Sequence, residues 1–216
     1  MSQLFHPSSN AIAKVSIFGS VFFVGFAAWV LLAIERSSYV TQAQVVVEQP
    51  VPFSHRHHVA QLGIDCRYCH TSVEESSFAG IPATKTCMTC HSQIHTTADI
   101  LEPVRESWQT GKSLEWVRVH DLPDFVYFNH SIHVKKGIGC ESCHGPVGEM
   151  ALTWREHSLN MEWCLECHRA PEKFVRPREF VFDLNWKAGK DKKTLSDSLV
   201  QAYHIESLTN CSICHR

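Results

Sequence analysis

The stretch FSHRHHVAQLGIDCRYCH, residues 53–70, returns as FNHSIHVKKGIGCESCH at residues 128–144. Each copy begins with F-x-H-x-x-H-V and ends with C-x-x-C-H. A second C-x-x-C-H follows each copy, and a fifth stands near the end of the chain. An internal repeat of this kind predicts two similar modules followed by a single extra unit.

All ten cysteines of the chain fall into these five motifs. They are Cys66, Cys69 and His70; Cys87, Cys90 and His91; Cys140, Cys143 and His144; Cys164, Cys167 and His168; and Cys211, Cys214 and His215. The motif is typical of covalently attached c-type haem, because two thiols add to the vinyl groups on one porphyrin edge while the adjacent histidine binds the iron. Zinc ribbons need no histidine after each pair, and a thioredoxin-like C-x-x-C would occur once within a βαβ pattern. The sequence therefore predicts five covalently bound haem c groups.

Five such haems need five further axial ligands on the opposite side of the iron. The repeat supplies His55 and His58 in its first copy and His130 and His133 in its second. In a helix, residues three apart lie on one face but about 4.5 Å apart along the axis, so the two imidazoles should serve two different irons. These four histidines are predicted distal ligands, and the sequence leaves open which haem each of them serves.

Two histidines, His120 and His204, are candidates for the fifth distal ligand. His204 precedes Cys211 at the spacing that separates His133 from its motif, whereas His120 lies in the aromatic stretch WVRVHDLPDFVYF. A methionine could fill one distal site instead, since thioether ligation raises the reduction potential of a haem. The candidates are Met150 and Met161, and core packing is the alternative role of both. The histidines predicted to be surface or propionate-pairing residues are His57, His95 and His157.

Residues 15–34, VSIFGSVFFVGFAAWVLLAI, carry no charge. As a helix they span about 30 Å, enough to cross a bilayer core. The apolar part of a cleaved signal peptide is shorter, about 7–15 residues, so a retained transmembrane anchor is predicted. Haem c is attached outside the bacterial inner membrane, which places residues 1–14 in the cytoplasm and, after a linker at 35–51, residues 52–216 in the periplasm.

Within the periplasmic part we expect one two-haem module at 52–100, a second at 120–170, and a linker with the fifth haem at 171–216, its stretch 171–210 mostly irregular. Porphyrins should supply much of the apolar interior. The expected fold is therefore mainly α with much irregular structure: a multihaem cytochrome c domain on one N-terminal transmembrane helix. With 44% hydrophobic residues the chain is not disordered, and 20 Lys and Arg against 22 Asp and Glu argue against nucleic-acid binding.

The repeated modules resemble those of class III multihaem cytochromes c. More narrowly, PVRESWQTGKSLEWVRVHDLPDFVYFNHSIHV (103–134), GIGCESCHGPVGEMALTW and LNMEWCLECHR resemble the pentahaem cytochrome c subunit of bacterial alternative complex III, a quinol oxidase. That resemblance implies a single-pass, outward-facing subunit of a membrane quinol-oxidising complex. Its partners would be an integral membrane quinol-binding subunit, an iron–sulfur subunit, and a monohaem cytochrome c or terminal oxidase as acceptor. HDLPDFVYF belongs to the family pattern, so the resemblance favours His120 as the fifth ligand.

The expected role is electron transfer, with no catalytic residue in this chain. A haem that reduces nitrite is usually marked by lysine in place of the motif histidine, and all five motifs here keep histidine. The alternative is a stand-alone, membrane-anchored quinol dehydrogenase cytochrome that feeds a periplasmic reductase. The predicted span offers quinol no acid or base, which favours the relay.

Overall fold

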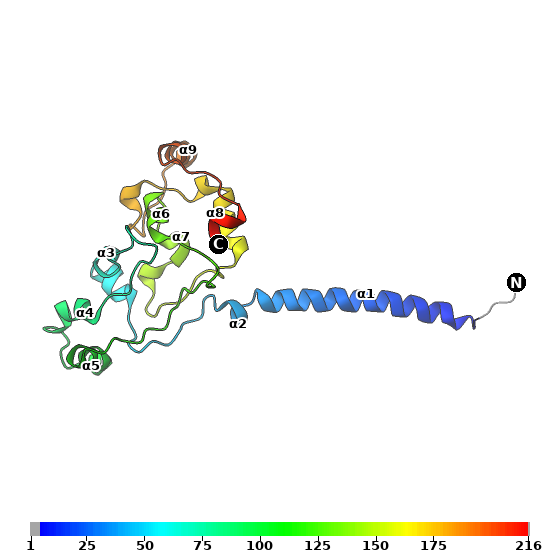
Figure 1. Cartoon of the computed structure of the whole chain (residues 1–216), viewed down its shortest axis with the longest axis horizontal. Coiled ribbons are helices and arrows are strands. Elements are labelled where there is room, and N and C mark those ends of the chain that lie inside the picture. The colour runs from blue at the N-terminus through cyan, green and yellow to red at the C-terminus, as the bar shows by residue number, and fades with distance from the viewer. Residues whose placement is uncertain (1–4, 216) are drawn as a thin grey trace. The chain divides into compact units, whose positions relative to one another are not determined.

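A computed structural model describes residues 5–215, and contacts divide the chain into two units between Ala43 and Gln44 (Figure 1). The first unit contains α1 (Ser8–Glu35) and the short α2 (Ser38–Thr41). Helix α1 includes the whole predicted span and extends it toward the N-terminus as far as Ser8. None of its side chains is buried by protein. An apolar helix of 28 residues, about 42 Å long, is compatible with a single-pass membrane anchor.

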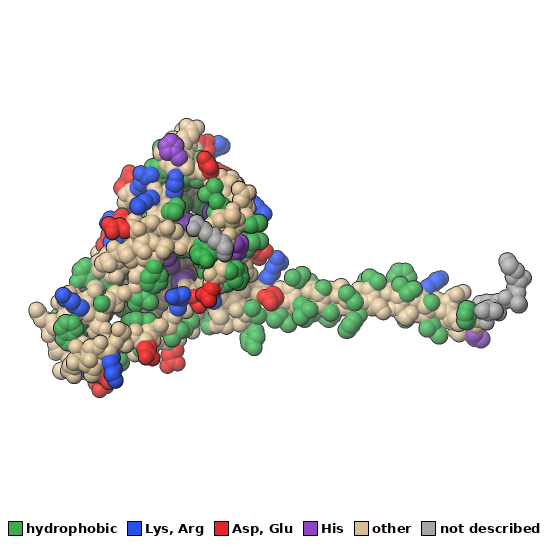
Figure 2. Space-filling model, in the orientation of Figure 1, with side chains coloured by type: hydrophobic (Ala, Val, Ile, Leu, Met, Phe, Trp, Pro, Cys, Tyr) green, Lys and Arg blue, Asp and Glu red, His purple; other side chains and the backbone are tan. Residues whose placement is uncertain are grey.

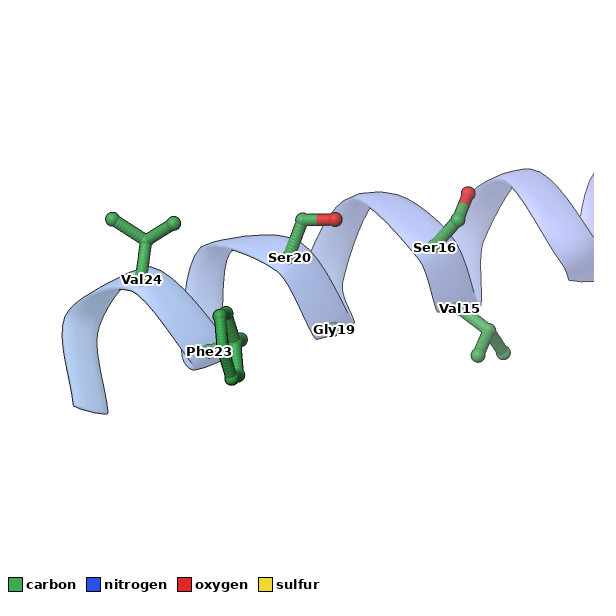
Figure 3. A pocket seen from close by; sticks show the side chains of 6 residues that line it. All are labelled: Val15, Ser16, Gly19, Ser20, Phe23 and Val24. Carbon is green, nitrogen blue, oxygen red and sulfur yellow. The ribbon is translucent and has the colours of Figure 1, made fainter. Parts of the chain in front are cut away.

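One face of α1 is hollowed by small residues. Ser16, Gly19 and Ser20 lie together there, bordered by the larger Val15 and Phe23 (Figure 3). The Ser16 hydroxyl donates to the Ala13 carbonyl at 3.1 Å, so this polar group is satisfied within the helix. The hollow leaves the backbone open to close approach along this face.

The second unit consists of short helical segments separated by long irregular connections. In chain order they are η1 (Arg56–Gln61, a π-helix), α3 (Cys66–Cys69), α4 (Thr84–His91), η2 (Asp99–Leu101), α5 (Glu102–Thr110), α6 (His130–Lys135), α7 (Glu141–His144), η3 (Val147–Glu149), α8 (Met161–Arg169), η4 (Pro171–Lys173), η5 (Arg178–Phe180), α9 (Lys192–Ala202) and α10 (Cys211–Cys214). The β-structure in residues 5–215 amounts to two isolated bridges, Val46 with Trp154 and Ile138 with Val175. The expected class, mainly helical with much irregular structure, is confirmed.

The stretch 171–210 is more ordered than the expected irregular linker. It contains α9, whose 11 residues make it the longest described helix of the second unit. Lys193 and Asp197, one helical turn apart, form an ion pair at 2.6 Å on its exposed side. The basic run KAGKDKK leads into the first residues of this helix, which is why composition alone suggested a solvated loop.

A buried ion pair ties the stretch after η4 to α7. The Arg176 guanidinium pairs with Glu141, lies 5.0 Å from the centre of the Trp186 ring, and has only 7% of its side chain exposed. Gly139 leaves room for it, because a Cβ there would lie 2.3 Å from the Arg176 Cζ. Gly137 adopts a φ of +76°, and a Cβ there would meet the Arg176 carbonyl oxygen at 2.3 Å. Both glycines are therefore required by close approach.

The protein-only core of the second unit is small. Six apolar side chains are buried among the described residues: Val51, Val73, Val104, Met150, Val175 and Val181. Many large apolar side chains are instead exposed, Ile81, Trp108 and Phe125 among them. Figure 2 shows such hydrophobic side chains across the face in view, with histidines among them. A domain of this size cannot be held together by so few buried groups, so further apolar material must complete its interior.

Candidate haem-binding sites

Each C-x-x-C pair lies on a single helical turn. In α3 and α10 the first cysteine of the pair is also the first residue of the helix. In α4 and α8 both cysteines lie inside the helix. In α7 the first cysteine, Cys140, is the residue before the helix. Residues three apart on a helix share a face, so the two thiols of a motif are placed to reach one edge of a planar group. All ten cysteines carry free thiols.

The possible metal ligands come together in pairs. Within residues 5–215 no group of three or more His, Cys, Asp or Glu side chains converges on one point. A structural zinc site would need four convergent ligands. Paired imidazoles suit a metal that takes its remaining ligands from a macrocycle.

The two copies of the repeat fold alike around their phenylalanines. The Phe53 ring stacks on His58 at 4.5 Å and meets His55 edge-on at 4.9 Å. In the second copy Phe128 stacks on His133 at 4.5 Å and meets His130 edge-on at 4.7 Å. The phenylalanine thus sets the directions of both imidazoles, which explains why F-x-H-x-x-H is the repeated unit.

The second histidine of each copy faces the histidine of the module's second motif. The ring centres of His58 and His91 are 6.3 Å apart with planes at 68°, and those of His133 and His168 are 6.2 Å apart with planes at 70°. Two imidazoles that bind one metal from opposite sides have ring centres roughly 6 Å apart, given metal–nitrogen bonds of about 2 Å. Both separations fit a shared iron.

The first histidines of the two copies lie in one cluster with the first motifs of both modules. The ring centres of His130 and His144 are 6.4 Å apart with nearly parallel planes, at 11°. His55 lies near His70, whose charge adds to burial in lowering the pKa of His55 to about 4. Burial likewise lowers the pKa of His144 to about 3. These imidazoles are therefore neutral at pH 7, the form that binds metal.

Hydrogen bonds hold the Nδ1 atoms of most of these histidines and leave Nε2 available. His58 and His133 bond through Nδ1 to the carbonyls of Ser54 and Asn129, each four residues earlier, at 2.9 and 2.7 Å. His70 bonds in the same way to the Gly80 carbonyl at 2.7 Å. Metal-binding histidines almost always donate their other ring N–H in this manner, which fixes the tautomer and the ring direction. Nδ1 also bonds to backbone carbonyls in three further pairs: His91 with Ile94, His130 with Ser77 and His215 with Phe125. In His55 it is hydrogen-bonded to the Thr153 hydroxyl at 3.1 Å.

His120 is placed between two motifs. Its own segment is tied to the fifth motif, because the Phe125 carbonyl accepts from His215 and the Tyr127 N–H donates to the Cys214 carbonyl. Its ring lies beside the third motif, with Nε2 3.2 Å from Nδ1 of His144. Burial lowers the pKa of His120 to about 4.

Exposure separates the predicted distal ligands from most of the other histidines. The five predicted ligands are all at least partly buried, whereas His57, His95 and His204 are exposed. His157 is partly buried and stacks on Trp163 at 4.8 Å. Met150 is completely buried, and Met161 is 65% exposed at the start of α8.

Among residues 5–215, three buried side-chain atoms have no hydrogen-bond partner: Nε of Arg155, Nε of Arg176 and one carboxylate oxygen of Glu141. An unpaired buried donor is costly, and Arg155, which has no carboxylate partner among the ion pairs of the described residues, is placed to receive an anionic group. Haem carries two propionates, which arginine binds well. With the paired imidazoles, the free thiols and the incomplete core, the residues present fit c-type haem. Sequence reasoning missed these arginines and the contact between His120 and His144, because both depend on segments far apart in the chain.

Comparisons with known proteins agree with this geometry. The profile of the family described as cytochrome c7 and related cytochrome c matches residues 51–110 and 126–216, which contain all five motifs. The menaquinone reductase multiheme cytochrome c subunit of Nitratidesulfovibrio vulgaris Hildenborough is 39% identical over 98 residues, 45% of this chain and 46% of that protein. Cytochrome c-552 of Porphyromonas gingivalis is 29% identical over 92 residues, 39% of this chain and 18% of that protein, and cytochrome c-552 of Bacteroides fragilis gives the same values. The chain thus matches less than half the length of each of these relatives.

Proposed function

Because the chain belongs to the family of cytochrome c7 and related cytochromes c, which bind haem c covalently and transport electrons, we propose that it is a five-haem relay. It accepts electrons from a partner that oxidises menaquinol and passes them to a periplasmic acceptor. The observation that carries the proposal is the duplicated pairing of His58 with His91 and of His133 with His168. Two ligands per iron leave no position for a substrate, as an electron carrier requires.

Each motif holds one haem by its two cysteines and its histidine. His55, His58, His130 and His133 complete the first four sites, and His120 completes the fifth. Bound haem supplies an iron that exchanges single electrons. The chain's own part is to fix the imidazoles through their Nδ1 bonds, to exclude water, and to pair a propionate with Arg155.

The partners follow from two resemblances. The relative from Nitratidesulfovibrio is named as a subunit of a menaquinone reductase, and the sequence resembles the pentahaem cytochrome of alternative complex III. We therefore place this chain beside an integral membrane quinol-binding subunit and an iron–sulfur subunit of the bacterial inner membrane. A monohaem cytochrome c or a terminal oxidase accepts the electrons. Helix α1 anchors the chain, with its N-terminus in the cytoplasm and the second unit in the periplasm.

The test compares the purified chain with the intact complex. Alone, the holoprotein should exchange electrons rapidly with small redox dyes but show negligible menaquinol oxidation and nitrite reduction. Quinol oxidation needs a proton acceptor, which the uncharged span 15–34 lacks, and nitrite reduction needs an open iron. In the complex, menaquinol should reduce the haems, and removal of the iron–sulfur partner should abolish this while dye reduction persists. Menaquinol oxidation by the chain alone at the rate of the complex would establish the quinol dehydrogenase function instead.

A further inference from the structure

Contacts between the motifs indicate which haem sites are neighbours. The order of these neighbours in space differs from the order of the motifs in the sequence. We propose that the five haems form one unbranched relay in the spatial order second, first, third, fourth and fifth motif. The inference rests on the proposed function, since it requires every motif to carry haem. Its two ends are then the second and the fifth motifs.

The first and second motifs are joined directly. Tyr68 lies between the two cysteines of the first motif, and Thr89 lies between those of the second. The hydroxyls of these two residues are hydrogen-bonded at 2.7 Å. The attachment loops of the two haems therefore touch.

The first and third motifs meet across the two modules. The side chains of Cys66 and Cys140, the first cysteine of each motif, lie close to one another. A second contact supports this, because the Arg67 guanidinium lies 4.5 Å from the centre of the Phe182 ring. The neighbouring Val181 carbonyl accepts from the Cys140 N–H at 3.2 Å. The first haem thus has neighbours on two sides, the second and the third.

The third and fourth motifs share helix α6. This six-residue helix presents His130 to His144 of the third motif at 6.4 Å between ring centres. It presents His133 to His168 of the fourth motif at 6.2 Å. Ligands three residues apart hold the two irons in fixed relation.

The fourth and fifth motifs are linked at the end of the chain. The Ser207 hydroxyl, shortly before α10, donates to the His168 carbonyl at 2.9 Å. Cys214 of the fifth motif lies near Cys164 of the fourth.

The arrangement of the helices in the second unit agrees with this order. In Figure 1, α4 lies beside α5 at one end, α3, α6 and α7 lie between, and α8 lies with the C-terminus at the other end. Partners that give and take electrons should therefore contact the neighbourhoods of α4 and of α10. An electron that passes between them crosses all five haems.

Electron paramagnetic resonance of the holoprotein tests the order. His58→Ala opens one coordination position on the second haem and gives it a high-spin signal, whose relaxation is accelerated by paramagnetic neighbours. Adding Cys66→Ser with Cys69→Ser removes the first haem and should slow that relaxation severalfold. The matched change, Cys140→Ser with Cys143→Ser, removes the third haem and should leave the relaxation unaltered within error. A pyridine haemochrome assay should give four haems in each of the two variants that carry the cysteine substitutions.

Dependence of the relaxation on the third haem rather than the first would overturn the order. The iron positions in the unaltered holoprotein, located by X-ray anomalous scattering, provide a measurement that needs no variant. The shortest iron–iron path should run second, first, third, fourth, fifth, and any other path refutes the inference. Fewer than five irons in the unaltered protein would count against the proposed function and would still reveal the order of those present.

Discussion

In the proposed relay, His120 is the side chain that completes the fifth haem site. We expect His120→Ala to convert one low-spin haem to high spin, because its segment is held against the fifth motif through Phe125 and Tyr127. Electron paramagnetic resonance of the holoprotein measures the change. In the native protein all five haems should be low-spin and six-coordinate.

Two matched variants control this prediction. His57→Ala removes an exposed imidazole bonded only to Gln61 and should leave the spectrum unchanged. His204→Ala should also leave it unchanged, and a high-spin haem in that variant alone would transfer the fifth ligand to His204. A wholly low-spin His120→Ala protein with an altered potential at the third haem would instead assign His120 to the Nδ1 atom of His144.

At the residue scale, spacing in the sequence identified the candidate ligands but not what holds them. The sequence shows the motif histidines because haem attachment requires C-x-x-C-H at fixed spacing. It also shows two repeated histidine pairs, His55 with His58 and His130 with His133, because each pair recurs at the same interval after a phenylalanine. The carbonyls that bind Nδ1 of His70 and His130 belong to Gly80 and Ser77. Any residue type supplies a carbonyl, so no sequence signal marks these two positions.

Among the elements, α1 is the one that we expect to determine where the rest of the chain is delivered. An arginine at the centre of a membrane helix costs about 2.5–3.5 kcal/mol, so Val21→Arg combined with Val24→Arg should cost about 5–7 kcal/mol. We expect haem-stained protein to disappear from the carbonate-washed membrane fraction, because a chain that fails to insert does not cross to the side where haem is attached. The matched control, Ser37→Arg with Ser38→Arg, places the same charges beyond α1 and should retain the membrane-bound haem protein.

Protease treatment of spheroplasts measures the orientation in the same experiment. Residues beyond about 40 should be removed from the native chain while a fragment containing α1 remains, since only the span itself is shielded by the bilayer. A haem domain protected in intact spheroplasts and cleaved only after lysis would reverse the orientation.

Sequence patterns predicted the elements unevenly, for physical reasons. The apolar run of 15–34 predicts α1 because a span must be long and uncharged. Neither α9 nor the π-helix η1 was predicted. Helix α9 is short and rich in lysine, and its partly buried face depends on contacts with η4 that follow from tertiary structure. The first copy of the repeat has one residue more than the second between its phenylalanine and its first cysteine, and it forms the π-helix η1 where the second copy forms the α-helix α6.

At the scale of the whole molecule, the second unit lacks the apolar interior of an ordinary domain. Six buried apolar residues among those described cannot offset the conformational entropy of ordering the chain, whereas exposed residues such as Ile81 and Trp108 offer surfaces against which porphyrins can pack. We infer that covalent haem is part of the core as well as the redox cofactor.

The full chain made without haem attachment should therefore keep α1 in detergent but lose the fold of residues 44–215. Hydrogen exchange followed by mass spectrometry distinguishes the two units in one sample. Amides of α1 should remain protected, because their bonds lie within one helix inside the micelle. Those of α6, α7 and α8 should exchange within seconds, since these short helices are stable only against packed neighbours. The holoprotein in the same detergent is the control, and equal protection of α6 to α8 in both forms would show that the polypeptide folds without its haems.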